Sequence, residues 1–282
     1  MGQGVLYVVA TPIGNLKDIS ARAVETLSMV DVVAAEDTRH TAQLLGHLGI
    51  KKSLISVHEH NEVDQVNTLR RLLDEGKRVA LVSDAGTPLI SDPGYRVVSD
   101  LRAANYQVSP IPGACALVAA LSASGLPSDR FVFEGFLPAK KNARREALAG
   151  FLQETRTTIF YESTHRIRET LEDMVEVFGG HRELVLAREL TKTFETFFKG
   201  TLGQVHAFVH EDENQCKGEF VLLLSGVELE SGPVSRVDIA VDDLLKGLMG
   251  HLPVKQVAAL VSKLSGAGKN ELYQRALALK DV

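Results

Sequence analysis

Residues 79–94 read VALVSDAGTPLISDPG, and this stretch decides the fold class. Val79–Val82 is a short continuous apolar run, which is typical of a strand buried on both faces of a parallel sheet. The loop from Asp84 to Gly94 holds two aspartates, two prolines and two glycines, which predicts a rigid connection. A loop of this kind lies at the carboxyl end of its strand, where open α/β sheets bind ligands.

The same alternation of strand and helix extends from this stretch over the first 125 residues. Leu6–Ala10, Val32–Ala35 and Val108–Ile111 are further apolar runs of strand length. Apolar residues at helical spacing mark Glu62–Glu75 as a helix, and Gly76 follows where a helix commonly ends. We therefore expect an α/β domain with an open, largely parallel sheet over residues 1–125.

The rest of the chain divides into a second α/β domain and a helical extension. Leu126–Asp129 has the composition of a linker, so the second domain is predicted over residues 126–229. Its strands are predicted at Phe131–Gly135, Thr158–Tyr161, Leu184–Arg188 and Phe220–Leu224. Residues 230–282 are predicted to form three short helices at Val237–Met249, Val254–Leu264 and Asn270–Leu279. Their spacing suits a helix-turn-helix unit, although such units also serve as dimer or packing modules.

Composition limits the classes of function. The 282 residues are 45% hydrophobic and 24% charged, as in soluble globular proteins, and the net charge is −5. This charge excludes a basic field over the whole protein, but local basic patches such as Lys140–Arg145 stay open as nucleic-acid contacts. No apolar run reaches the roughly 18–20 residues of a membrane span, and the first residues lack a signal-peptide pattern. We expect a cytoplasmic protein without a membrane contact.

Two polar segments, Glu36–His40 and His58–Glu62, are candidates for acid, base or RNA contacts, or they are exposed loops. The H-E-H spacing of the second segment lacks a third ligand, and the two cysteines are far apart in sequence, so no metal site is expected. The loop after the first strand has the single glycine Gly14, which argues against a dinucleotide fingerprint.

Longer motifs carry a family resemblance. LYVVATPIGNLKDIS (6–20), AAEDTRHT (34–41), VSDAGTPLISDPGY (82–95), FYESTHRI (160–167) and LARELTKTFET (186–196) resemble the ribosomal RNA small subunit methyltransferase I family. This family belongs to the tetrapyrrole-methylase-like, class III S-adenosylmethionine methyltransferases, and the resemblance covers essentially the whole chain.

The resemblance implies two α/β domains that bind S-adenosyl-L-methionine in the cleft between them, usually in a homodimer. The implied reaction is methylation of the ribose 2′-oxygen of a cytidine, at position 1402, in 16S rRNA of the small ribosomal subunit. The implied cofactor-binding residues are Pro12, Ile13, Asp84, Gly86, Leu89, Ile90, Asp92, Cys115, Ala116, Tyr161, Ala187, Arg188, Glu219 and Phe220. Residue patterns alone single out the central loop and the small-residue turn at Cys115 and Ala116, whereas the positions from Tyr161 onward rest on the resemblance.

A ribose hydroxyl is a weak acid, so a general base would accelerate its methylation by roughly 10²- to 10⁴-fold. Our hypotheses are His58 or Glu59 as the base and Arg39 as a cation that orients the substrate. One alternative keeps the chemistry but takes a tetrapyrrole, another small molecule or a modified protein side chain as acceptor. A second alternative is a helix-turn-helix regulator whose α/β domains sense a small ligand.

Overall fold

The computed structural model describes residues 4–58, 61–228 and 241–280. It divides into two compact units, Met1–Val227 and Glu228–Val282, which are described separately below. The first unit contains two five-stranded sheets, and the second contains three helices. The predicted fold class, two α/β sheets with a helical extension, is confirmed; the predicted boundaries at residues 125 and 229 stay predictions.

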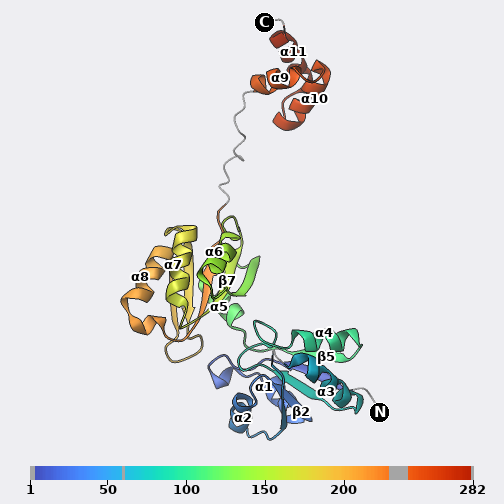
Figure 1. Cartoon of the computed structure of the whole chain (residues 1–282), viewed down its shortest axis with the longest axis vertical. Coiled ribbons are helices and arrows are strands. Elements are labelled where there is room, and N and C mark those ends of the chain that lie inside the picture. The colour runs from blue at the N-terminus through green and yellow to red at the C-terminus, as the bar shows by residue number, and fades with distance from the viewer. Residues whose placement is uncertain (1–3, 59–60, 229–240, 281–282) are drawn as a thin grey trace. The chain divides into compact units, whose positions relative to one another are not determined.

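The first sheet is entirely parallel, with strand order β3-β2-β4-β1-β5. Its strands are β1 (Val5–Val9), β2 (Val32–Ala35), β3 (Ser53–Ser56), β4 (Val79–Val82) and β5 (Gln107–Ile111). The helices that connect them are η1 (Leu16–Asp18), α1 (Ala21–Met29), α2 (Thr38–His47), α3 (Glu62–Asp74) and α4 (Tyr95–Ala103). Apolar residues of α1 and α2 pack on one face of the sheet, and those of α3 and α4 pack on the other (Figure 1). The central strand β4 is buried throughout, as its continuous apolar sequence predicts.

The second sheet is mixed, with strand order β6-β7-β10-β8-β9. Its strands are β6 (Phe131–Phe136), β7 (Thr157–Ser163), β8 (Glu183–Arg188), β9 (Thr196–Thr201) and β10 (Glu219–Leu224). β10 is antiparallel to both of its neighbours, β7 and β8. The carboxyl ends of β7 and β8 and the amino end of β10 therefore meet at one edge of the sheet.

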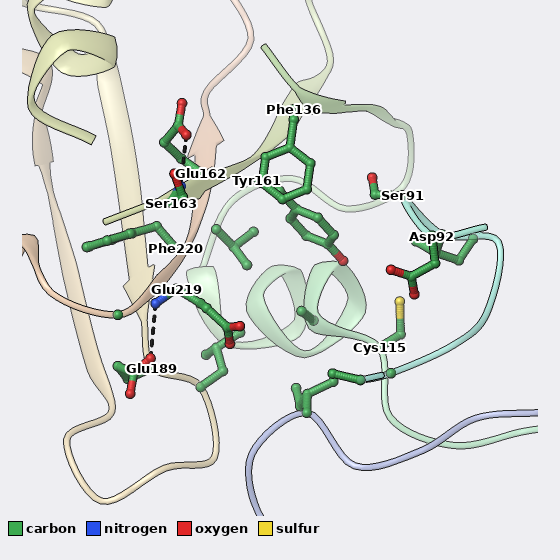
Figure 2. Close-up of a pocket in the computed structure, with 18 of the residues that line it drawn as sticks. Ser91, Asp92, Cys115, Phe136, Tyr161, Glu162, Ser163, Glu189, Glu219 and Phe220 are labelled. Atoms are coloured by element: carbon green, nitrogen blue, oxygen red, sulfur yellow. Dashed lines mark hydrogen bonds between the residues drawn. The ribbon is translucent and has the colours of Figure 1, made fainter. Parts of the chain in front are cut away.

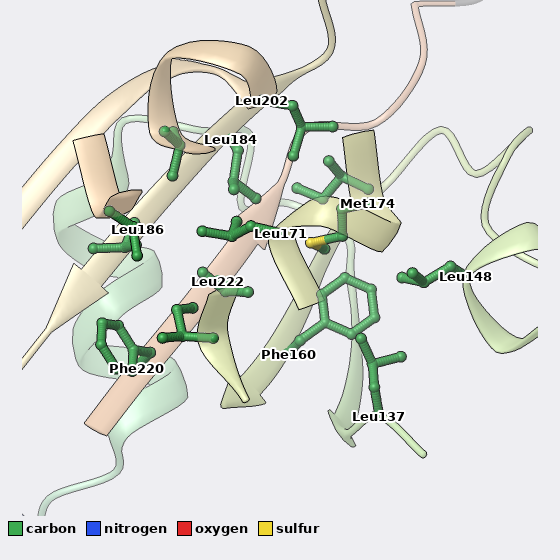
Figure 3. Packing of buried hydrophobic residues seen from close by; sticks show 14 residues of the cluster. Leu137, Leu148, Phe160, Leu171, Met174, Leu184, Leu186, Leu202, Phe220 and Leu222 are labelled. Atoms are coloured by element: carbon green, nitrogen blue, oxygen red, sulfur yellow. The ribbon is translucent and has the colours of Figure 1, made fainter. Parts of the chain in front are cut away.

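Helices cover both faces of this second sheet. One face packs against α6 (Lys141–Ala149), α7 (Ile167–Phe178) and α8 (Leu202–Glu211), and Figure 3 shows the resulting core around Phe160 and Leu222. The other face packs against α5 (Ala116–Ser124). The sequence analysis assigns this helix to the first domain, residues 1–125. Helix α5 directly follows β5 of the first sheet in the sequence and packs on the second sheet, so it connects the two sheets.

The sequence analysis did not predict β3, β9 or α8. Strand β9 is an edge strand with half-exposed side chains, so its apolar signal is weak. Helix α8 begins with a capping box, in which Thr201 Oγ1 accepts from the Gln204 backbone N–H and the Gln204 side chain accepts from Thr201. That T-x-x-Q pattern is a sequence signal for the start of a helix.

The basic run Lys140–Arg145 is not a free positive patch. Arg144 is buried, and its Nε donates to Asp173 Oδ2 at 2.7 Å. Arg145 Nε donates to the other oxygen of the same carboxylate at 2.7 Å, and Arg145 also pairs with Glu176. Both arginines thus join α6 to α7, whereas the other two cations of the run, Lys140 and Lys141, are exposed.

The second unit is a three-helix cluster of α9 (Val241–Met249), α10 (Val254–Ser265) and α11 (Lys269–Lys280). Its core is formed by Leu245, Val257, Ala258, Val261, Leu272 and Ala276. The first residues of the predicted helix Val237–Met249 lie outside the described residues. Among the helices that the structure describes, none is long and apolar enough to cross a bilayer.

Candidate functional site

A cavity of about 540 Å³ lies where the strand ends of the two sheets meet. On one side it is lined by the loop after β4 and by the start of α5. On the other side it is lined by the end of β7, the loop after β8 and the start of β10 (Figure 2). We call it the first cavity. The parallel topology places it at the carboxyl edge of the first sheet, as the sequence predicts for this fold class.

The loop after β4 is held in an uncommon backbone conformation. Leu89 and Ser91 have φ angles of 73° and 61°, in the left-handed region that side chains disfavour. Gly86 has φ 80°, and a Cβ atom there would lie 3.1 Å from Ile13 Cγ2. The Thr11 N–H donates to the Gly86 carbonyl at 2.8 Å and the Gly86 N–H donates back at 3.1 Å. Strain that is fixed by such surroundings is typical of ligand-binding loops.

The loop after β8 approaches the loop after β1 closely. The Asn15 N–H donates to Thr191 Oγ1 at 3.1 Å. A Cβ atom on Gly14 would lie 2.5 Å from Lys192 Cγ, so any other residue there would force the Lys192 side chain to move. Glu189 and Thr191 also have positive φ angles, 52° and 65°. The cavity wall is therefore preorganised on both sides.

Asp92 is the carboxylate most affected by its surroundings in this cavity. Burial raises its pKa to about 6; a Ser83 hydrogen bond lowers it, and the nearby carboxylates of Glu36 and Asp84 raise it further. Figure 2 shows its carboxylate beside the sulfur of Cys115 and facing the hydroxyl of Tyr161. Because the charged groups that shift Asp92 are both acidic, a ligand with a positive charge is the natural partner for its ionised form.

Aromatic rings form an apolar wall next to Asp92. The Tyr161 ring packs edge-to-face against Phe133 and Phe136, with centroids 4.9 and 5.8 Å apart. The Leu117 N–H, in the first turn of α5, donates to Tyr161 Oη at 3.0 Å. Burial raises the pKa of Tyr161, so this hydroxyl stays protonated. The wall offers a flat surface for an adenine-sized ring.

The opposite wall carries an ion-pair cluster. Lys192 Nζ lies 2.8 Å from Glu189 Oε1 and 2.9 Å from Glu219 Oε2. The Glu219 N–H also donates to Glu189 Oε1 at 3.0 Å. With one lysine between two carboxylates, this wall is acidic overall.

A second cavity of about 510 Å³ adjoins the first. The two share the lining residues Ile13, Ala85, Lys192 and Glu219. The rest of its lining is more polar: one side of α2 contributes His40, Thr41, Gln43, Leu44 and His47. Asp84 reaches the same space, with Oδ2 3.9 Å from His40 Nδ1 and Oδ1 accepting from the Asp37 N–H at 3.0 Å. A histidine and a carboxylate thus lie together next to the shared wall.

The structure separates the predicted binding residues into three groups. Those that line the first cavity are Ile13, Gly86, Ile90, Asp92, Cys115, Ala116, Tyr161, Glu219 and Phe220. Pro12 and Asp84 line the second cavity instead. Leu89, Ala187 and Arg188 are in the lining of neither cavity.

These last three residues have other contacts. Leu89 packs against the core on the α3–α4 side of the first sheet. Ala187 is fully buried in the core under α5. Arg188 is nearly buried, and its guanidinium donates to the carbonyl oxygens of Asn214 and Lys217 at 3.2 and 3.0 Å. All three side chains thus take part in packing of the loops and sheets, and cofactor binding by these residues stays a prediction.

Of the predicted catalytic residues, the two that the structure describes, Arg39 and His58, line neither cavity. The Arg39 side chain is 88% exposed and its guanidinium pairs with Asp37 at 2.6 Å. His58 follows β3, where its backbone N–H is held by Asn61 Oδ1 at 2.8 Å, and it lines neither described cavity. Glu59 lies outside the described residues.

Sequence reasoning missed Glu162, Glu189 and Lys192, which line the first cavity. It named His40 only within the segment Glu36–His40, as a candidate for acid, base or RNA contacts. A signal was available for the first two, because Glu162 stands at the carboxyl end of β7 and Glu189 directly follows β8. The rule that selected the loop after β4 applies equally to these strand ends. Lys192 and His40 have no comparable signal, since only the tertiary fold brings them to the shared wall.

Comparison with known families covers most of the chain. The sequence model of the tetrapyrrole (corrin/porphyrin) methylases matches residues 5–206, and that of the RsmI C-terminal HTH domain matches residues 236–280. The chain is 53% identical to "Ribosomal RNA small subunit methyltransferase I" of Escherichia coli O157:H7 over 98% of this chain and 95% of the relative. It is 52% identical to the Pseudomonas aeruginosa protein of the same name over 98% of both chains. The predicted family resemblance is confirmed.

Solved structures show the same fold at low sequence identity. A cobalt precorrin-4 methyltransferase matches 78% of this chain and 94% of its own with a TM-score of 0.59, at 16% identity. A diphthine synthase matches 78% and 90% with a TM-score of 0.58, at 15% identity. At these identities the likeness supports the fold and says nothing about the acceptor.

Proposed function

We propose a function from one premise: the chain belongs to the ribosomal RNA small subunit methyltransferase I family, within the tetrapyrrole (corrin/porphyrin) methylases. The protein is a methyltransferase. Its proposed donor is S-adenosylmethionine and its proposed substrate is 16S rRNA of the small ribosomal subunit, in the cytoplasm. The proposed acceptor atom is the ribose 2′-oxygen of cytidine 1402, and the proposed oligomer is a homodimer.

The observation that carries the proposal is the pair of adjoining cavities with different linings. The first has an aromatic wall and a buried carboxylate among acidic neighbours. The second has two histidines and the Asp84 carboxylate, and the two cavities share four lining residues. Methyl transfer needs a donor and an acceptor side by side in a fixed orientation, which is worth up to roughly 7–11 kcal/mol of the barrier.

The first cavity fits the donor. When bound, S-adenosylmethionine supplies a methyl group that its sulfonium sulfur has already activated. Asp92 and Glu219 complement the positive charges of such a ligand, and the Tyr161 wall suits its adenine. The small side chains Cys115 and Ala116 leave space at the start of α5.

The second cavity fits the acceptor. A ribose hydroxyl must lose its proton during transfer, and we assign His40 to accept it at an imidazole nitrogen. Asp84 lies 3.9 Å from His40 Nδ1, so its carboxylate stabilises the imidazolium that forms. This assignment replaces His58 as the proposed base, because His40 lines the second cavity and His58 lines neither cavity. Glu59 lies outside the described residues.

Contacts to the rest of the RNA are proposed at the rim of the second cavity and on the second unit. Within the run Lys140–Arg145, Arg144 and Arg145 contribute little, because both are held in ion pairs. A macrocycle or another small acceptor is the alternative, and it would need no contact from the helix-turn-helix unit. The regulator hypothesis is set aside, since the chain belongs to a methyltransferase family.

A transfer assay on small ribosomal subunits tests the assignment of His40. The variant His40→Asn should lower the rate of transfer by roughly 10²- to 10⁴-fold and leave the affinity for S-adenosylmethionine unchanged. The matched variant His47→Asn changes a histidine about two turns further along α2 and should lower the rate of transfer far less. Equal rates in His40→Asn and the unmodified protein would reject His40 as the base.

A further inference from the structure

Two histidines and a glutamate form a cluster on the far side of the second sheet from α5. His206 and His210 are one turn apart on α8, and Glu172 is on the neighbouring helix α7. One potential ligand atom from each of the three residues lies within 4.8 Å of the other two. Histidines at i and i+4 project from the same side of a helix, so α8 presents both rings toward one point.

Hydrogen bonding determines which ring nitrogen of His210 is available. His210 Nδ1 lies 2.9 Å from the backbone oxygen of His206, so it must carry a proton and donate. In the neutral ring the lone pair is then on Nε2, which lies 3.3 Å from Glu172 Oε1. Two acceptors at this distance repel each other unless a proton or a cation lies between them. A backbone carbonyl that fixes the histidine tautomer is also typical of metal-ligating histidines.

The distance between the ligand atoms of His210 and Glu172 matches a small tetrahedral ion. Zinc binds histidine nitrogen at about 2.0–2.1 Å and carboxylate oxygen at about 2.0–2.2 Å, so neighbouring ligand atoms are about 3.3–3.5 Å apart. The separation of 3.3 Å between His210 Nε2 and Glu172 Oε1 equals this value. The ring of His206 stacks on that of His210 at 4.0 Å between centroids.

We propose that Glu172, His206 and His210 form a zinc site, with water as the fourth ligand. Two imidazole nitrogens and one carboxylate oxygen are a donor set that zinc accepts. The ion would join α7 to α8, two helices that already share the core of the second sheet. The proposal does not depend on the donor, the acceptor or the base assigned above.

Calorimetric titration of the full chain with zinc chloride tests this site, on protein purified without a histidine tag. The expected result is binding of one ion per chain, and the same binding in the control variant His181→Ala, which changes a histidine outside the cluster. His206→Ala and His210→Ala should each weaken it more than roughly tenfold, because loss of even a second-shell partner costs that much. Cobalt should give the visible absorption of a tetrahedral site in the unmodified protein and lose it in both variants.

Zinc should also raise the midpoint of thermal unfolding in the unmodified protein and in His181→Ala, but not in the double variant of His206 and His210. Because both side chains are half-buried and neither belongs to the apolar core of the second sheet, the variants should fold, and unchanged methyl transfer would verify this. Zinc binding of equal strength in the double variant, or no stoichiometric binding by the unmodified protein, would overturn the proposal.

Discussion

Binding of S-adenosylmethionine should weaken as the pH falls below 6, because Asp92 must be ionised to attract a cationic ligand. Burial raises the pKa of this carboxyl to about 6 in the free protein. A positive ligand would stabilise the ionised form and lower that pKa, so binding releases a proton. The affinity for S-adenosylmethionine therefore increases with pH up to the pKa of Asp92 in the free protein and levels off above it.

The magnitude follows from the same pKa. With a pKa of about 6, roughly a tenth of the carboxyl is ionised at pH 5 and roughly nine-tenths at pH 7. If the ionised form alone binds, the affinity changes by about tenfold between these two pH values, which corresponds to about 1.4 kcal/mol. Glu36, whose pKa burial also raises, titrates nearby, so the contribution of Asp92 must be isolated by substitution.

Calorimetric titration at pH 5, 6 and 7 measures this dependence in the unmodified protein, in Asp92→Asn and in the exposed-site control Asp129→Asn. The control should reproduce the full pH dependence, and Asp92→Asn should bind weakly with most of the dependence gone. S-adenosylhomocysteine, which lacks the sulfonium charge, should show a smaller loss on substitution of Asp92. An unchanged slope in Asp92→Asn would refute the assignment of this carboxylate.

Two further substitutions and one truncation test the architecture. Gly86→Ala should lower the free energy of unfolding by about 1–2 kcal/mol in urea titrations, because φ 80° disfavours any side chain and Ile13 is close; equal stability would contradict this. Asp173→Ala should cost about 3–5 kcal/mol in the same assay, since it leaves Arg144 buried without its partner, and a loss below 1 kcal/mol would argue against the buried pair. Truncation after Val227 should preserve donor binding and impair transfer to small subunits or dimerisation, and full activity would exclude a recognition role for the second unit.

Much of the first sheet can be predicted from the sequence, because its buried strands are continuous apolar runs between glycine- and proline-rich loops. The carboxyl ends of parallel strands share one edge, so the loop from Asp84 to Gly94 and the turn at Cys115 could be placed at one site. The structure brings Asp92 and Cys115 to the same cavity, in agreement with that reasoning. The position of the binding site at this edge can therefore be predicted from the order and direction of the strands.

The rest depends on tertiary contacts that have no local signal. Arg188 and Glu189 are adjacent, yet the arginine ties together loop carbonyls while the glutamate lines the cavity. Arg144 looks like part of an exposed basic run, but it pairs with Asp173, 29 residues away in sequence. His40 is equally ambiguous in the sequence, and only the packing of α2 places it next to Asp84.

The most direct test of the central claim uses labelled S-adenosylmethionine with small subunits, large subunits and naked 16S rRNA from cells that lack this enzyme. Nucleoside mass spectrometry then identifies the modified nucleoside and its position. The account predicts labelled 2′-O-methylcytidine at position 1402, in small subunits and not in large ones. Donor binding without label on any RNA, or label on a base instead of a ribose, would contradict it.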